Sequence, residues 1–204
     1  LPTDWAGTPL GEAVSLGIHE SQSRLWENQV GRSRAFWEWA LPLLPEHVPS
    51  TAGVTVDRLY PALHTVTPGF IRVEADEATY NLHIQARFEL ELALLTGDLA
   101  VNDLPGAWND TYERLLGIRP ATDTEGCLQD VHWPTGAIAY FPTYTVGNLY
   151  AASMGAAVEA ALPTLWDDVA NGQFGAILDW LRTNVHAHGH ALEAPEIARN
   201  AVGE

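Results

Sequence analysis

A glutamate that directly follows a histidine, Glu20, offers the clearest chemistry in this sequence. A catalytic zinc ion is held by three protein ligands and keeps one position open for water or substrate. In one large group of such sites, two histidines come from an H-E-x-x-H helix and a glutamate comes from a later helix. Glu20 has the type and setting of that later glutamate. The simpler interpretation is an ion pair with Arg24, one helical turn further on.

The H-E-x-x-H helix itself does not occur in these residues. Ser23 stands where the second histidine would be, and no other His-Glu pair is present. The sequence therefore indicates one part of a metal site, whose other ligands come from a longer protein. The opening at Leu1, without a methionine or an apolar leader, agrees with that expectation.

A second stretch with chemical potential covers residues 70–77. We expect a helix here, on which Arg72, Asp76, Thr79 and His83 recur at steps of four, three and four and share one face. Arginine is well suited to hold a carboxylate through two parallel hydrogen bonds. A solvated ion pair between Arg72 and Asp76 is the alternative.

The third stretch combines residues 126–133 with residues 140–144. Asp130 is placed to orient His132, and a tyrosine could donate a hydrogen bond to an oxyanion that develops during a reaction. Loops that carry Gln, Asp, His and Trp together are often functional. A purely structural loop remains the alternative.

Composition narrows the class of protein. The 204 residues, 47% of them hydrophobic and eight of them tryptophan, suffice for one buried core. No apolar stretch approaches the 18 residues of a membrane span. The net charge of −16 argues against nucleic acid as a partner. Cys127 is the only cysteine, which excludes an internal disulfide and favours a reducing, cytoplasmic compartment.

The spacing of apolar residues predicts a mainly α protein without internal repeats. We expect a long helix over residues 17–44 and a connector over 45–69 that holds a short helix near 56–64. Further helices are expected over 70–96, 103–117, 143–161, 163–171 and 173–190, with an irregular stretch over 117–136 and a short, fraying helix over 193–204.

Together and in this order, the three stretches resemble the carboxypeptidase Taq family of zinc metallocarboxypeptidases. The strings that carry the resemblance are residues 19–28, 70–77 and 126–133, followed by 140–144 and 147–150. The resemblance implies a helical zincin-type metallocarboxypeptidase fold, of which residues 1–204 form the C-terminal portion of one catalytic domain. It also implies a homodimer that removes C-terminal residues from peptides with one divalent metal ion, zinc or alternatively cobalt or manganese.

The resemblance assigns a role to each candidate residue. Glu20 is expected to be the third metal ligand, and Arg72 the residue that recognises the free carboxylate of the substrate. The other expected roles are Gln129, Asp130 and Tyr140 in substrate binding, His132 and Tyr144 in catalysis, and His19 and Asp76 in support of these residues.

Two other readings compete with this hypothesis. The chain could be a helical module that holds peptides or forms dimers without catalysis of its own. It could also belong to an endopeptidase on a related helical scaffold. Because two zinc ligands and the general-base glutamate would lie outside this chain, we expect the isolated chain to be inactive.

Overall fold

The computed structural model describes residues 1–203, and these form helices and loops without a strand. The mainly α prediction is therefore confirmed. The chain divides into two compact units. The first unit combines Leu1–Leu63 with the chain from Val146 onward, and the second unit is His64–Thr145. The prediction that residues 1–204 belong to one catalytic domain concerns a longer protein and stays a prediction.

Helices that are far apart in the sequence build the first unit. They are α1 (Leu16–Arg24), α2 (Arg34–Ala40), α3 (Val56–Leu63), most of α6 (Pro142–Ala161), α7 (Leu165–Ala170), α8 (Gly175–Asn184) and α9 (Ala194–Val202). The core contains Leu25, Met154, Ile177, Leu181 and Ile197, each at most 1% exposed. It joins the segment after α1 to α6, α8 and α9.

The continuous helix expected over residues 17–44 is wrong. After α1 the chain forms a π-helix over Leu25–Gly31 and then breaks. Ser33 is extended, and its hydroxyl accepts a hydrogen bond from the backbone N–H of Phe36, which starts α2. Serine at such an N-cap competes with helix continuation, and the apolar periodicity does not register it.

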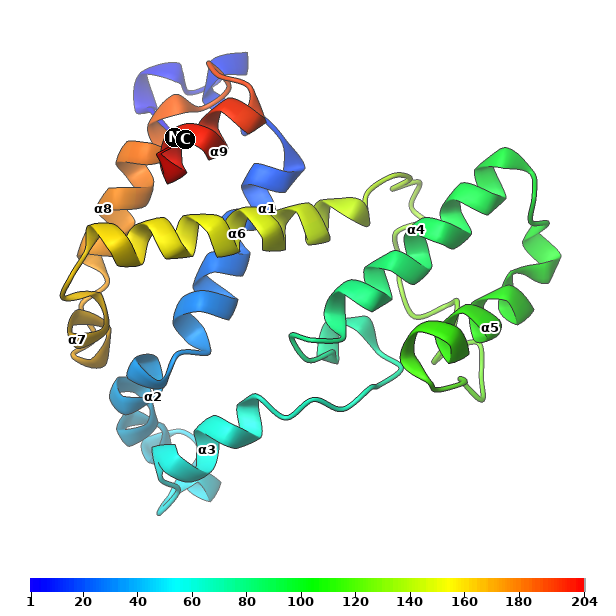
Figure 1. Cartoon of the computed structure of the whole chain (residues 1–204), viewed down its shortest axis with the longest axis horizontal. Coiled ribbons are helices and arrows are strands. Elements are labelled where there is room, and N and C mark those ends of the chain that lie inside the picture. Colours follow the sequence, from blue (N-terminus) through cyan, green and yellow to red (C-terminus); the bar gives the residue numbers. More distant parts are fainter. Residues whose placement is uncertain (204) are drawn as a thin grey trace. The chain divides into compact units, whose positions relative to one another are not determined.

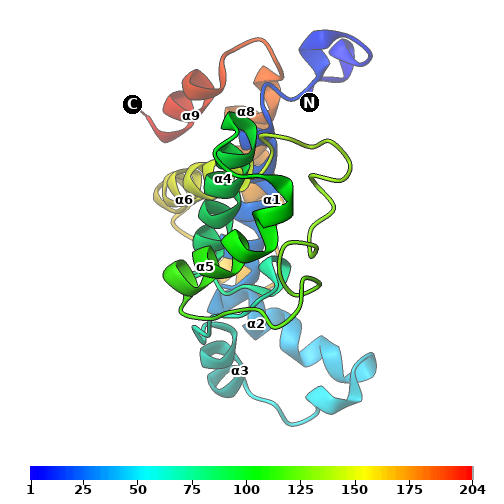
Figure 2. The ribbon, with the colours of Figure 1, turned by 90° about the vertical axis from the view of Figure 1, so that its right-hand side faces the viewer.

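Two antiparallel helices, α4 (Tyr80–Thr96) and α5 (Leu104–Leu116), frame the second unit (Figures 1 and 2). Trp108 and Tyr112 of α5 are fully buried and stack with ring centroids 4.9 Å apart. Each helix ends at a glycine with positive φ, 82° at Gly97 and 72° at Gly117, which is a common way to stop a helix. Residues 117–141 run as loops and turns, which confirms the irregular stretch predicted over 117–136.

The expected helix start near residue 70 is also wrong. Arg72–Glu74 form a single 3₁₀ turn, and α4 begins only at Tyr80. Asp76 explains the delay, because its carboxylate accepts hydrogen bonds from the backbone N–H groups of Ala78 and Thr79, at 2.9 and 2.8 Å, and of Thr67 at 2.9 Å. Asp76 and Arg72 therefore share neither a helix face nor an ion pair.

The other helices fall near their predicted places. α3, α5, α6, α7 and α9 are confirmed to within a few residues, while α8 ends at Asn184 and gives way to a 3₁₀ turn at His186–His188. The fraying predicted at Glu204 lies outside the described residues. In the part of the chain that the structure describes, no helix is long and apolar enough to cross a membrane.

Candidate functional site

Arg72, a candidate residue of the second unit, is buried and makes several hydrogen bonds. It is 6% exposed, and its backbone N–H donates to the Gln129 side-chain oxygen at 2.9 Å. Its Nε and Nη2 donate to Oδ1 of Asp130 at 3.0 and 2.7 Å. Nη1 donates to the hydroxyl of Tyr80 at 3.1 Å. Residues from the two predicted motifs, 58 positions apart in the sequence, thus meet directly.

Asp130 is shared between two arginines. While Oδ1 receives Arg72, Oδ2 receives Nε of Arg87 at 2.6 Å and lies 2.5 Å from its Nη2. Burial alone would raise the pKa of the Asp130 carboxyl, but the hydrogen bonds and charges of the two arginines outweigh burial and hold that pKa below its usual value. Asp130 is therefore a carboxylate at neutral pH.

His132 links this cluster to Tyr144. Its Nε2 lies 3.0 Å from the Tyr144 hydroxyl, and its buried Nδ1 lies 3.7 Å from Asp130 Oδ1, beyond hydrogen-bond length. A carboxylate only accepts hydrogen bonds, so the tautomer with the proton on Nδ1 is favoured, and Nε2 then accepts the tyrosine hydrogen. Burial lowers the pKa of His132, although the charge of Asp130 acts in the opposite direction. The lowered pKa favours a neutral ring.

Aromatic rings enclose the same cluster. The Arg72 guanidinium lies 4.9 Å from the ring centroid of Tyr144, a cation–π contact. Tyr140 lies with its ring centroid 5.4 Å from that of His132 and 5.5 Å from that of Tyr144. The predicted residues Arg72, Gln129, Asp130, His132, Tyr140 and Tyr144 therefore form one group, although their assigned roles in binding and catalysis stay predictions.

The Gln129 side chain connects two loop segments through hydrogen bonds to their backbones. Its side-chain amide donates to the carbonyl oxygens of Phe70 and Glu125, each at 2.9 Å, while its oxygen accepts from the Arg72 backbone. The amide hydrogens are thus engaged within the protein. This geometry fixes the segment that carries Arg72.

Sequence reasoning missed three of the residues that α4 contributes and placed the fourth, His83, on a shared face with Arg72 that does not form. Tyr80, His83, Arg87 and Glu91 recur at steps of three, four and four, and all four are buried. Glu91 accepts hydrogen bonds from Nε1 of Trp133 and from the backbone N–H of Ala139, each at 2.6 Å. That second bond holds Ala139 at a φ of 59°, a left-handed conformation that costs an alanine about 1–2 kcal/mol. The helical spacing of these four polar residues was the signal that could have revealed them.

Glu20 lies in the first unit, on α1. Its Oε1 accepts from Nε of Arg24 at 3.0 Å, and Nη1 of Arg24 also donates to Glu27 at 3.0 Å. Glu20 and Arg24 thus form the expected ion pair, and His19 beside them is exposed. The role of Glu20 as a metal ligand stays a prediction. The Glu20 side chain packs against Gly147 of α6, where an added Cβ would lie 2.7 Å from Glu20 Cγ.

A catalytic metal ion such as zinc needs three protein ligands. Residues 1–203 contain no group of three or more His, Cys, Asp or Glu side chains that could hold one. The described residues therefore do not fit a complete metal site by themselves. Glu20 offers a single carboxylate.

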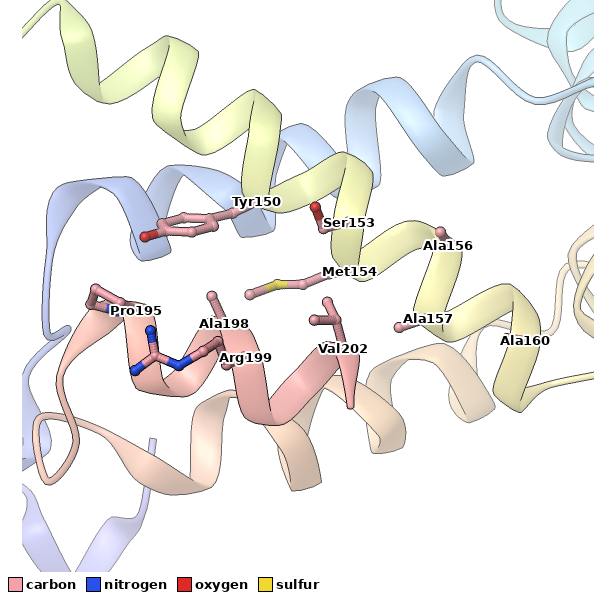
Figure 3. Close-up of a pocket in the computed structure, with 10 residues that line it drawn as sticks. All are labelled: Tyr150, Ser153, Met154, Ala156, Ala157, Ala160, Pro195, Ala198, Arg199 and Val202. Carbon is pink, nitrogen blue, oxygen red and sulfur yellow. The ribbon is translucent and has the colours of Figure 1, made fainter. Parts of the chain in front are cut away.

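The first unit also contains a cavity of about 610 Å³ between α6 and α9 (Figure 3). Tyr150, Met154 and Arg199 line it together with alanines. None of the predicted site residues is among its lining residues, so the cavity plays no part in the candidate site.

Comparison with known proteins places the chain in a family. A family model described as carboxypeptidase Taq (M32) metallopeptidase matches residues 1–204. Thermostable carboxypeptidase 1 of Thermus thermophilus is 49% identical over 204 residues, which are 100% of this chain and 40% of the relative. Carboxypeptidase 1 of Bacillus subtilis is 42% identical over 200 residues, which are 98% of this chain and 40% of the relative.

Solved structures agree with these relatives. The crystal structure of M32 carboxypeptidase from Deinococcus radiodurans R1 has a TM-score of 0.92 at 48% identity and covers 100% of this chain and 41% of that one. The BsuCP crystal structure has a TM-score of 0.96 at 41% identity, again over 100% of this chain and 41% of the other. The chain spans about 40% of the length of the curated relatives that it matches. It belongs to the carboxypeptidase Taq (M32) family of metallopeptidases.

Proposed function

We propose that this chain is the C-terminal part of a metal-dependent carboxypeptidase that removes C-terminal amino acids from peptides. Its membership of the family and the names of its relatives support this activity. The observation that carries the proposal is the setting of Arg72, a buried guanidinium held by Asp130, Tyr80 and the backbone contact to Gln129.

Arg72 is suited to bind the free carboxylate of a peptide. The bonds to Asp130 and Tyr80 engage three of its five side-chain N–H donors. We infer that the two remaining donors bind a carboxylate that reaches the cluster, and a rigid guanidinium loses little conformational freedom when it binds. The enzyme would therefore require a C-terminal carboxylate and act as an exopeptidase.

Tyr144 and His132 supply a second function beside Arg72. In the favoured tautomer the Tyr144 hydroxyl hydrogen points to His132 Nε2. A substrate carbonyl that gains negative charge would draw this hydrogen away from the histidine, and a donor of this kind is typically worth about 3–4 kcal/mol in a transition state. Tyr140 is the alternative donor.

For the metal we propose zinc, with cobalt or manganese as alternatives, and Glu20 as the ligand that this chain contributes. Zinc in such enzymes activates water and polarises a carbonyl. The other ligands would come from a part of the complete protein that these 204 residues do not include. His19 and Asp76 are proposed to support the site without contacting substrate.

A non-catalytic function is the second candidate for the chain on its own. The missing three-ligand group among residues 1–203 favours a helical module that holds peptide or forms a dimer. For the complete protein we propose a homodimer without nucleic-acid or membrane partners, in the cytoplasm. The net charge of −16 and the single cysteine support the absence of nucleic acid and the reducing compartment.

The test uses the complete protein that carries this chain and a pair of peptides that differ only in a free or an amidated C-terminus. Hydrolysis of the free form alone is expected. Arg72→Met should raise KM for the free form about 10- to 150-fold, the effect of losing one hydrogen bond to a charged group. Arg119→Met removes an exposed arginine of the same unit and should leave KM unchanged. Equal hydrolysis of the amidated peptide would refute the proposal.

A further inference from the structure

Arg87, in the middle of α4, is the most deeply buried arginine of the candidate site. Its exposed fraction is 0%, whereas arginine is rarely buried unless its charge is paired. The sequence around it, rich in Glu, Leu and Ala, reads as an ordinary helix with a solvated arginine. None of the motifs that carry the family resemblance includes this residue.

Hydrogen bonds and ring contacts hold the Arg87 guanidinium on the side of Nη1. Its Nη1 donates to the carbonyl oxygen of His83, one turn earlier on α4, at 2.8 Å, and to the hydroxyl of Tyr112 on α5 at 2.9 Å. The rings of Trp108 and Phe141 lie 4.8 and 5.4 Å away. Two helices and two rings therefore fix where Arg87 presents its remaining edge.

That remaining edge meets Asp130. Nε and Nη2 of Arg87 face Oδ2, and the same two atoms of Arg72 face Oδ1. A carboxylate whose two oxygens are held by different arginines cannot turn about its own bond without losing one of them. Arg87 thereby sets the orientation of Asp130.

The orientation of Asp130 decides how the Arg72 guanidinium is turned. Nε and Nη2 of Arg72 both donate to Oδ1, so the plane of the guanidinium follows the position of that oxygen. Without Arg87, Asp130 could turn about its side-chain bonds and form a bidentate pair with the same two nitrogens of Arg72. The guanidinium would then shift, and its remaining donors would point in another direction.

We propose that Arg87 is a positioning residue, which fixes Asp130 and thereby the direction in which Arg72 presents its remaining donors to the C-terminal carboxylate of the peptide. This inference rests on the proposed function of Arg72. It assigns to Arg87 no contact with substrate.

The experiment compares Arg87→Met and Arg87→Lys with Arg72→Met in the complete protein. For a peptide with a free C-terminus, Arg87→Met should raise KM about 10- to 100-fold, as expected when an anchoring group moves by about 1 Å, with a much smaller change in kcat. Arg87→Lys keeps the charge but has a single donor point for Oδ2, so its KM should fall between the wild-type and Arg87→Met values. Arg119→Met is the matched control.

The outcomes separate the two proposals. If Arg72→Met leaves KM unchanged, the proposed function is wrong. If Arg72→Met raises KM but both Arg87 variants lower only kcat, Arg87 merely supports the fold and this inference is overturned. Thermal unfolding of each variant identifies a loss of folded protein, and should Arg87→Met not fold, the KM of Arg87→Lys decides.

Discussion

Replacing Asp130 with asparagine tests the electrostatics of the candidate site most directly. The change keeps the shape of the side chain and removes its charge, so that Arg72 and Arg87 stay buried without a counter-ion. Their side chains are only 7% and 0% exposed. Removing one partner of a buried ion pair costs about 3–5 kcal/mol. Because two arginines lose the same partner, we expect a cost in the upper half of that range.

Hydrogen exchange of the 204-residue chain measures this loss of stability separately in each of the two units. Backbone amides of α4 and α5 should lose protection in Asp130→Asn, while those of α8, in the core of the first unit, should keep it. Asp110→Asn serves as the control, since Asp110 is 74% exposed where it pairs with Arg119. Such an exposed pair contributes about 1 kcal/mol or less.

A triple variant separates charge from contact. Arg72→Met, Arg87→Met and Asp130→Leu together remove all three charges, and well-packed apolar replacements of buried ion pairs are often neutral. We expect this variant to be more stable than Asp130→Asn alone. An Asp130→Asn protein within about 1 kcal/mol of the Asp110→Asn control would refute the reasoning.

The same cluster has a pH dependence of known sign. The pKa of Asp130 is lower in the folded chain than its ordinary value near 4. Its contribution to stability is therefore fully present above that ordinary value and is lost as the pH falls through the folded value. In Asp130→Asn this acid-dependent loss should be smaller than in the wild type.

Three further predictions concern other parts of the structure. Gly147→Ala should destabilise the first unit by about 1–3 kcal/mol in urea unfolding, because the new Cβ would lie 2.7 Å from Glu20 Cγ. Gly106→Ala is the control, because the new Cβ would have no atom of another element within 4 Å, and it should be neutral or stabilising. Burial, aided by Arg87, lowers the pKa of His83 to about 4 from 6.5. The unfolded chain then binds the proton first, and stability should fall by up to about 3 kcal/mol as the pH drops from 6.5 to 4; a His83→Gln chain with the same slope would contradict this. Calorimetric titration of the 204-residue chain with zinc should show no tight one-to-one binding, and micromolar affinity would mean that a complete site had been overlooked.

Local signals in the sequence were sufficient to predict helix ends where the residue that ends the helix is also the one that the pattern contains. Gly97 and Gly117 stop α4 and α5 in left-handed conformations, as glycines commonly do, at the helix ends expected near residues 96 and 117. Elsewhere the helix boundary depends on a side-chain hydrogen bond, which the periodicity of apolar residues does not reveal. Ser33 restarts a helix by accepting a backbone hydrogen bond, and Asp76 delays one by the same means. Both residues have helix-compatible spacing around them, so only the capping chemistry distinguishes them.

The motif residues were predicted as a set, but their partners were not. Resemblance brought Arg72, Gln129 and Asp130 together, and the structure shows the bonds between them. It was silent about Arg87, because the charge that Arg87 balances lies 43 residues away on a loop. No local pattern encodes a contact of that kind. The helical spacing of Arg87 with His83 and Glu91 could have shown that they share a face, but it does not identify the residues that this face contacts.

The helix α4 also departs from the usual pattern of amphipathic helices. Phe88, Leu92 and Leu95 are exposed, at 48%, 51% and 63%, whereas Ile84 and Leu90 are buried beside Arg87 and Glu91. Apolar residues thus lie on both faces, and a search for an apolar stripe does not identify the buried one. A charged buried face is stable only when each group finds its partner, and those partners, Asp130, Trp133 and the backbone of Ala139, all lie on one loop region. The orientation of α4 therefore depends on the docking of that loop, which joins the stability of the second unit to the geometry of the candidate site.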